Sequence, residues 1–308
     1  MQTASIVAGN ANGVGGNSLS SLNYPTGIWV AMNNSLYISD YGNHRVMKYL
    51  EGSLTGTIVA GTGSQGSSLS QLYYPTGIYV DISYNMYIAD SWNYRILFWP
   101  KDASSGIKRA GTGSSGSSLT NFGIISGLIV DSQSNIYVCD TLNHRVMKFV
   151  PNITVGIVVG GTTGSQGNSP TQLNTPYGIF LDEINSYLYV ADFNNHRIQR
   201  FHLGISLNGT TVAGGNGQGS AKNQLNNPAS VCISTITNSI YIADKGNNRV
   251  QRWTSQFTFG VTIAGNGAST SNASTSIENP MDIRINRNET ALYVSESAYN
   301  RIWRFTLI

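Results

Sequence analysis

Apolar residues along this chain come in short runs of four to six positions that are rich in Val, Ile and Tyr and bounded by Gly, Asn, Ser or Pro. Typical runs occupy residues 25–30, 36–40, 45–49 and 57–61. Runs of this kind are typical of short β-strands, and no segment keeps the 3.6-residue apolar period of a helix. The pattern therefore predicts an all-β protein without substantial helix.

The runs recur in one order around an anchor motif, Asp-x-x-Asn-His-Arg and its variants. The six anchors span residues 40–45, 90–95, 140–145, 192–197, 244–249 and 296–301. Successive anchor Arg residues are 50, 50, 52, 52 and 52 positions apart. Units of four short antiparallel strands at this spacing are typical of propeller blades. The sequence predicts a six-bladed β-propeller with four antiparallel strands, a to d, in each blade.

The two ends of the chain predict how the ring closes. Residues 5–9 match the fourth-strand run at 57–61, whereas the last unit reaches only its third strand, at 301–305. We therefore expect the N-terminal strand to complete the sixth blade and the whole chain, 1–308, to form one domain. The blades are expected near residues 22–61, 72–111, 122–161, 173–215, 225–265, and 277–308 plus 1–9.

Each anchor is expected to form the hairpin between strands b and c. Asp accepts backbone N–H bonds in tight turns and Asn tolerates the left-handed conformation, while the rigid fork of Arg suits a partly buried carboxylate. We predict that each anchor Arg pairs with an anchor carboxylate of its own or a neighbouring blade, as a structural element. The residues are Asp40 and Arg45, Asp90 and Arg95, Asp140 and Arg145, Asp192 and Arg197, Asp244 and Arg249, and Glu296 and Arg301.

Gly-rich segments lie between strand d of one unit and strand a of the next. Residues 61–66 and 111–116 match G-x-G-x-x-G, but a dinucleotide site needs a helix after the motif, and here a further strand follows. No cofactor is therefore predicted. An apolar residue three positions before each strand a is expected to pin the connection to the core: Leu22, Leu72, Phe122, Leu173, Leu225 and Ile277.

Because strand directions alternate, the d–a connections and b–c hairpins should share one face of the disc, which we call the loop face. The loop face is the expected binding surface. Its candidate residues follow the anchor carboxylates: Tyr41, Trp92, Leu142, Phe193 and Lys245. Exposed aromatic residues there would suit a protein or sugar partner; the alternative is that they pack between neighbouring loops.

The sixth unit departs from the repeat. Positions of strand a that hold Gly and an apolar residue elsewhere become Asp282 and Arg284, and the anchor Asp becomes Glu296. These charges could form a channel site, with Asp282 as a weak metal candidate. They could equally form one ion pair that seals the ring, which is the interpretation we favour.

Composition and charge narrow the class of partner. Charged residues make up 11% of the chain, apolar residues 40%, and the formal net charge is +3. Nucleic-acid-binding domains usually carry a clear basic patch, so a nucleic acid is not expected as a partner. No stretch approaches the roughly 18 apolar residues of a membrane span.

Cysteines and sequons bear on the compartment. Cys139 and Cys232 lie in non-adjacent units, so we expect no disulfide between them. The N-terminus has no signal-peptide features, so a secreted parent protein would make this chain an excised domain. Five Asn-x-Ser/Thr sequons nevertheless favour a secretory route: Asn33, Asn152, Asn208, Asn272 and Asn288.

Asn-His-Arg followed by Val or Ile, within Pro-x-Gly-Ile-x-Val and Tyr-Ile-Ala-Asp, resembles the NHL repeat over essentially the whole chain. The resemblance implies a six-bladed propeller but specifies no activity, because one fold hosts many functions. Relatives of this fold include a peptide-amidating lyase with histidine-held zinc, calcium lactonases, RNA-binding domains of tripartite-motif proteins, and extracellular or sensor propellers.

Two metal-dependent activities and RNA binding fit the residues poorly. Three of the four histidines, His44, His144 and His196, are repeat positions, and His202 lies near the end of a strand c, which leaves none for a zinc site in the channel. A calcium site needs several oxygen ligands, and only Asp282 is a candidate. We therefore expect a non-catalytic, monomeric interaction scaffold, secreted or part of an ectodomain, that binds a protein or glycan.

Overall fold

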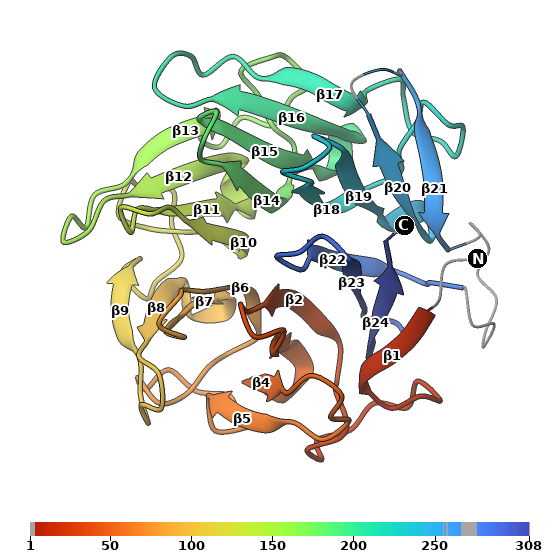
Figure 1. Cartoon of the computed structure of the whole chain (residues 1–308). Coiled ribbons are helices and arrows are strands. Elements are labelled where there is room, and N and C mark those ends of the chain that lie inside the picture. The colour runs from red at the N-terminus through yellow and green to blue at the C-terminus, as the bar shows by residue number, and fades with distance from the viewer. Residues whose placement is uncertain (1–3, 255, 257, 266–275, 308) are drawn as a thin grey trace.

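The computed structural model describes residues 4–254, 256, 258–265 and 276–307 and consists of six four-stranded antiparallel sheets arranged in a ring (Figure 1). The predicted fold class is confirmed. The first strands of neighbouring blades contact one another around the central channel. In the described part of the chain the helical segments are 3-10 turns of three residues, and none of them is long or apolar enough to cross a bilayer.

The blades follow one another along the chain. Blade one holds β2 (Pro25–Val30), β3 (Leu36–Asp40), β4 (Arg45–Tyr49) and β5 (Thr57–Ala60). Blade two holds β6 (Pro75–Val80), β7 (Met86–Asp90), β8 (Arg95–Trp99) and β9 (Ile107–Ala110). Blade three holds β10 (Ile125–Val130), β11 (Ile136–Asp140), β12 (Arg145–Phe149) and β13 (Ile157–Gly161). Blade four holds β14 (Pro176–Asp182), β15 (Tyr187–Asp192), β16 (Arg197–His202) and β17 (Thr210–Gly214). Blade five holds β18 (Pro228–Ile233), β19 (Ile240–Asp244), β20 (Arg249–Trp253) and β21 (Gly260–Ala264).

The sixth blade is completed by the start of the chain, as predicted. It holds β22 (Pro280–Ile285), β23 (Ala291–Glu296) and β24 (Arg301–Thr306), and its outer strand is β1 (Ala4–Gly9). β1 runs antiparallel to β24, with Ala4 opposite Phe305 and Gly9 opposite Arg301. Backbone hydrogen bonds between the two ends of the chain therefore close the ring.

The core lies between neighbouring blades, where apolar side chains from facing sheets form clusters. The predicted loop pins belong to these clusters and are fully buried: Leu22, Leu72, Phe122, Leu173, Leu225 and Ile277. Burying a side chain of this size contributes about 1.5–3 kcal/mol. The pins thus hold the d–a connections onto the core, as expected. Both cysteines are buried and unpaired.

The b–c hairpin corrects one detail of the sequence prediction. The left-handed residue is not the anchor Asn but the residue after it, for example His44 with φ of 52°. Asn43 instead donates hydrogen bonds to Asp40 and to the carbonyl of Gly16. The other Asp40 oxygen accepts the backbone N–H of Asn23. The anchor therefore ties the hairpin to the preceding d–a connection, and the two share the loop face.

The left-handed residue also reaches the next blade. The Nδ1 atom of His44 accepts the backbone N–H of Tyr74 at 3.2 Å. His144 and His196 make the same bond, whereas Asn248 and Asn300 replace the ring nitrogen with an amide oxygen, at 2.9 and 2.8 Å. We call these bonds the inter-blade latches. They show why His and Asn both occur at this position.

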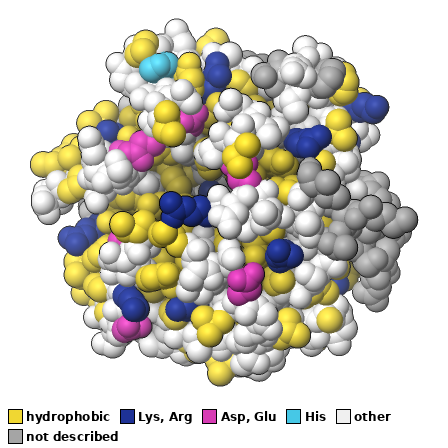
Figure 2. Space-filling view, in the orientation of Figure 1, with side chains coloured by type: hydrophobic (Ala, Val, Ile, Leu, Met, Phe, Trp, Pro, Cys, Tyr) yellow, Lys and Arg dark blue, Asp and Glu magenta, His cyan; other side chains and the backbone are white. Residues whose placement is uncertain are grey.

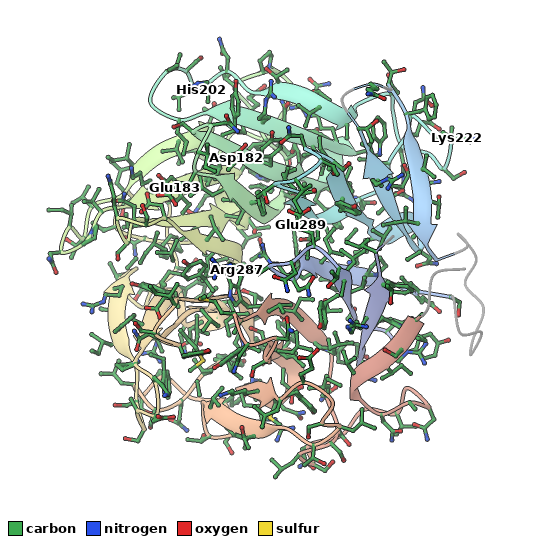
Figure 3. The ribbon with its side chains drawn as sticks, in the orientation of Figure 1. Asp182, Glu183, His202, Lys222, Arg287 and Glu289 are labelled. Carbon is green, nitrogen blue, oxygen red and sulfur yellow. The ribbon has the colours of Figure 1, made fainter. Side chains whose placement is uncertain are left out.

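The opposite face carries the a–b and c–d turns, and we call it the back face. Figures 1 to 3 look onto it: of the labelled residues, Asp182 ends β14, Glu183 belongs to the β14–β15 turn, and Arg287 and Glu289 belong to the β22–β23 turn (Figure 3).

Candidate functional site

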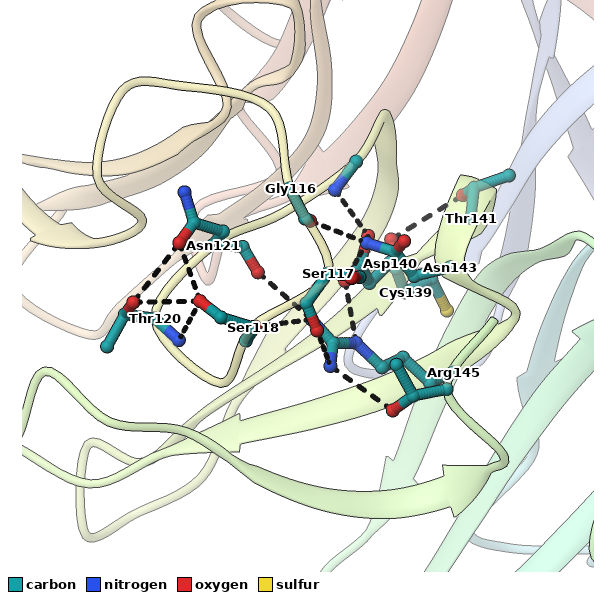
Figure 4. Close-up of polar contacts among 12 residues, drawn as sticks. Gly116, Ser117, Ser118, Thr120, Asn121, Cys139, Asp140, Thr141, Asn143 and Arg145 are labelled. Carbon is teal, nitrogen blue, oxygen red and sulfur yellow. Dashed lines mark hydrogen bonds and ion pairs between the residues drawn. The ribbon is translucent and has the colours of Figure 1, made fainter. Parts of the chain in front are cut away.

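The anchor residues form a structural network in every blade. In blade three, Arg145 Nε lies 2.8 Å from Asp140, and its two Nη atoms donate to the carbonyls of Ser117, Ser118 and Asn121 (Figure 4). The predicted ion pairs form within each blade, with Nε–O distances of 2.5 to 2.8 Å. The anchor side chains use their donors and acceptors for bonds within the protein, so these residues have a structural role.

The anchor carboxylates also have perturbed acidity. Burial raises the pKa of Asp140 above its ordinary value, and the hydrogen bonds from Asn143, Arg145 and the backbone of Gly123 oppose that rise. The same balance applies to Asp40, Asp90, Asp192 and Asp244. A perturbed carboxylate often marks a catalytic site, but here the effect recurs in five blades and follows from structural burial.

Aromatic side chains gather on the loop face over blades one and two. Tyr41 stacks on Tyr74 with ring centroids 4.5 Å apart, and Tyr74 lies 4.9 Å from Tyr73 and 5.6 Å from Trp92. Tyr24 is 59% exposed and Trp92 is 42% exposed. We call these five residues the aromatic platform. Tyr41, Tyr73, Tyr74 and Trp92 pack against one another, while Tyr24 and Trp92 leave much of their surface open to solvent.

A second group lies over blades four and five. The Phe193 ring packs 5.8 Å from Tyr177, and the Lys245 ammonium sits 5.2 Å above Phe193. Burial lowers the pKa of Lys245. Leu142 is 58% exposed. Of the predicted loop-face residues, Tyr41, Trp92, Phe193 and Lys245 pack against neighbouring loops. Trp92 and Leu142 are the most exposed of the five.

Four aromatic residues of these groups were not predicted from the sequence: Tyr24, Tyr73, Tyr74 and Tyr177. The predicted candidates all lie in the b–c hairpins, whereas Tyr24 and Tyr74 stand immediately before the Pro that opens strand a, and Tyr177 stands immediately after it. The signal was present as aromatic residues flanking that Pro in three units.

Members of both groups line a pocket of about 280 Å³ at the loop-face mouth of the channel. Tyr41, Trp92, Tyr177 and Lys245 contribute to its walls. Below it the channel narrows to a cavity of about 20 Å³, room for roughly one water molecule.

The constriction results from glycines on the inner strands of blades one to four: Gly27, Gly77, Gly127 and Gly178. A Cβ atom on Gly127 would lie 2.6 Å from the carbonyl oxygen of Tyr177. The glycines let neighbouring inner strands approach so closely that the two mouths of the channel are separate.

Asp282 closes the inner ring where the repeat is broken. Its carboxylate accepts the backbone N–H of Ile28 in blade one at 2.9 Å and the hydroxyl of Ser230 in blade five at 2.5 Å. Arg284 Nε lies 3.7 Å away from it. The carboxylate thus links three blades. Among the described residues, no group of three His, Cys, Asp or Glu side chains is placed to hold a metal ion.

Comparisons with known proteins agree with this architecture. A family model described as the NHL repeat matches residues 225–253, which include β18, β19 and β20 of blade five. The same motif recurs in the other units, and the structure has six blades. The chain is an NHL-repeat six-bladed β-propeller. A search of curated proteins finds no match.

Several solved structures share the fold at low identity. A protein of unknown function from Bacteroides thetaiotaomicron has a TM-score of 0.73 at 15% identity, covering 99% of this chain and 76% of its own. An auxiliary nutrient binding protein from the same organism has a TM-score of 0.68 at 13% identity, covering 99% and 76%. A gluconolactonase from Xanthomonas campestris has a TM-score of 0.66 at 12% identity, covering 94% and 88%. Binding proteins and enzymes therefore both use this architecture.

Proposed function

We propose that this chain is a non-catalytic binding module, secreted or part of an ectodomain, that holds a protein or glycan partner on its loop face. The observation that carries the proposal is the aromatic platform beside the loop-face pocket. Tyr and Trp offer a large contact area with few rotatable bonds, and they are enriched among the residues that dominate binding energy.

The sequons support the choice of face. The described sequon residues Asn33, Asn152, Asn208 and Asn288 are exposed and lie in a–b or c–d turns of the back face; Asn272 lies outside the described residues. N-linked glycans at the four described positions would leave the aromatic platform uncovered.

The hydrogen bonds that the Asp282 carboxylate already accepts favour a binding function over metal-dependent catalysis. Asp282 already accepts hydrogen bonds from Ile28, Ser230 and its own neighbour Ile283. A calcium ion would have to displace these donors. The likeness to the gluconolactonase concerns the fold alone.

The binding proposal is tested by screening the chain against a glycan array and a panel of purified ectodomains. Each ligand found is measured again with Trp92→Ala and Tyr74→Ala. Losing a central aromatic contact costs about 2 kcal/mol or more, so affinity should fall at least about thirty-fold. Tyr84→Ala, a tyrosine change on the back face, is the control and should bind as the wild type does. If every ligand bound both platform variants as tightly as the wild type, the assignment of the binding site to the loop face would be wrong.

A thermal melt of metal-stripped protein tests the non-catalytic part. A bound metal at about 100 times its Kd stabilises a fold by about 2.7 kcal/mol, which is several degrees of melting temperature. We expect no shift with calcium or zinc. A shift that Asp282→Asn abolishes would place a metal in the channel and contradict the proposal.

A further inference from the structure

The back face holds a second pocket that the proposed function does not use. It has a volume of about 240 Å³ and lies at the back-face mouth of the channel. Trp29, Phe180 and Ile285 supply apolar walls, and Arg284 and Arg287 also line it. Figure 2 shows hydrophobic side chains gathered around the middle of this face, with basic side chains among them. The glycine constriction separates this pocket from the loop-face pocket.

Arg284 is the unusual residue of this pocket. Its side chain is only 10% exposed. Its Nε donates to the carbonyl of Ile28 at 3.3 Å, and its guanidinium lies 5.1 Å from the Trp29 ring centroid. Among the described residues, its two Nη atoms have no hydrogen-bond partner. By contrast, the Nη atoms of the anchor residue Arg145 are both occupied.

The Nη atoms of Arg284 are not among the fully buried atoms that lack a partner, so they remain accessible from the pocket that Arg284 lines. Hydrogen bonds from a charged donor to a charged acceptor are among the strong ones. The planar fork formed by the guanidinium nitrogens matches the two oxygens of a carboxylate. Arg284 lines both the constriction and the back-face pocket. A carboxylate in the pocket would therefore satisfy donors that the protein leaves open.

The other charges around the pocket favour one negative charge on a ligand. Asp282, at 3.7 Å, neutralises Arg284 only in part. Burial raises the pKa of Glu289, but hydrogen bonds from Ser234, Thr235 and the backbone of Ile236 outweigh it and lower the pKa overall. Glu289 therefore stays ionised and directed at those donors. Arg287 lies beside the centre of the ring, at the rim of the pocket (Figure 3).

We propose that the back-face pocket binds a small monocarboxylic acid with an apolar body. The carboxylate pairs with the Nη atoms of Arg284, the body lies against Trp29 and Phe180, and Arg287 adds attraction at the rim. This site is independent of the loop-face partner, because it lies on the other side of the glycine constriction.

The experiment is isothermal titration calorimetry of the full chain with 3-phenylpropionate, octanoate and the neutral 3-phenylpropionamide. Asn288 is an exposed sequon residue next to Arg287, so the protein is made without N-glycans. We expect at least one of the two acids to bind. A hydrogen bond to a charged group contributes about 1.5–3 kcal/mol, so the amide should bind at least about ten-fold more weakly than 3-phenylpropionate.

Four variants locate the site. Arg284→Met should weaken acid binding at least about ten-fold, and Arg287→Ala, a rim change that leaves the core intact, about three-fold. Asp282→Asn should tighten binding, because the competing carboxylate is removed. Trp92→Ala, on the loop face, should have no effect. Equal binding of acid and amide, no binding of either acid at about 5 mM, or binding unchanged by both Arg284→Met and Arg287→Ala would overturn the proposal.

Discussion

The sixth blade and the other five have matching outer halves and different inner strands. In all six, an Arg at the start of strand c pairs with a carboxylate at the end of strand b. On the inner strand, four blades place Gly at the channel, and the equivalent strand position is Ser230 in blade five and Asp282 in blade six. The comparison shows that the outer half of a blade sets the frame, whereas the inner strand is where one blade can acquire a property the others lack.

Breaking the shared frame should have the largest effect. Arg145→Met leaves the Asp140 carboxylate buried without its cation. Removing one partner of a buried ion pair costs about 3–5 kcal/mol, measured as the shift in the free energy of unfolding in urea. The control is Arg200→Met, on strand c over the Tyr187 ring, which should cost far less. Equal losses in the two variants would contradict a structural role specific to the anchor.

Filling the glycine constriction should have the next largest effect. The Cβ atom of Gly127→Ala would meet a backbone oxygen at 2.6 Å, and overpacking of this kind costs about 1–3 kcal/mol. In blade five the equivalent position already holds a side chain, so Ser230→Ala should cost only its hydrogen bond to Asp282, about 1 kcal/mol. If Gly127→Ala proved as stable as the wild type, the inner strands would not be in close contact in solution.

Giving blade six the residue of blade five should have an effect of similar size at most. Asp282→Ser removes the acceptor of the Ile28 N–H and of the Ser230 hydroxyl, which is a loss of about 1–3 kcal/mol for two bonds at roughly 0.5–1.5 kcal/mol each. Thermal unfolding measures it, with Asp102→Ser as the control because that side chain is 85% exposed. An unchanged melting temperature would mean that Asp282 does not link the blades.

The latches predict the smallest effect, a dependence on pH. Burial lowers the pKa of His44 and His196 from their ordinary 6.5, so the unfolded chain binds protons more readily than the folded one. The latch contribution is complete above pH 6.5 and decreases as the pH falls towards and past the lowered values. Melting temperature measured from pH 7.5 to 5 should therefore decline.

A control for that measurement replaces the latch histidines with Asn. Asn248 and Asn300 already make the same bond, and their side chains do not titrate. The double variant His44→Asn, His196→Asn should flatten the pH dependence by about 1 kcal/mol or less per latch. If the melting temperature of the double variant declined with pH as that of the wild type does, the two histidines would not be the cause of the decline.

The sequence predicted the repeating parts of the molecule well and the local ones less well. Because the anchor occurs in six copies, the number of blades, the Arg–carboxylate pairs and the buried pins could all be predicted from the sequence. It placed the left-handed turn on Asn43 instead of His44, because both residue types tolerate that conformation and only the register of the turn decides. Tyr74 and Trp92 are 18 residues apart in the sequence, and their contact depends on how a d–a connection meets a hairpin. The open Nη atoms of Arg284 follow from packing around a ring, which no single unit encodes.

The anchor carboxylates also bear on how the loop face moves. Each holds a backbone N–H of the preceding d–a connection, as Asp140 holds that of Gly123 at 2.8 Å. In hydrogen exchange the Gly123 amide should be protected nearly as long as the strands beneath it, although it belongs to a surface loop. A surface that is held rigid in this way loses little conformational entropy when a partner binds. The six anchors therefore prepare the loop face for recognition before any ligand arrives.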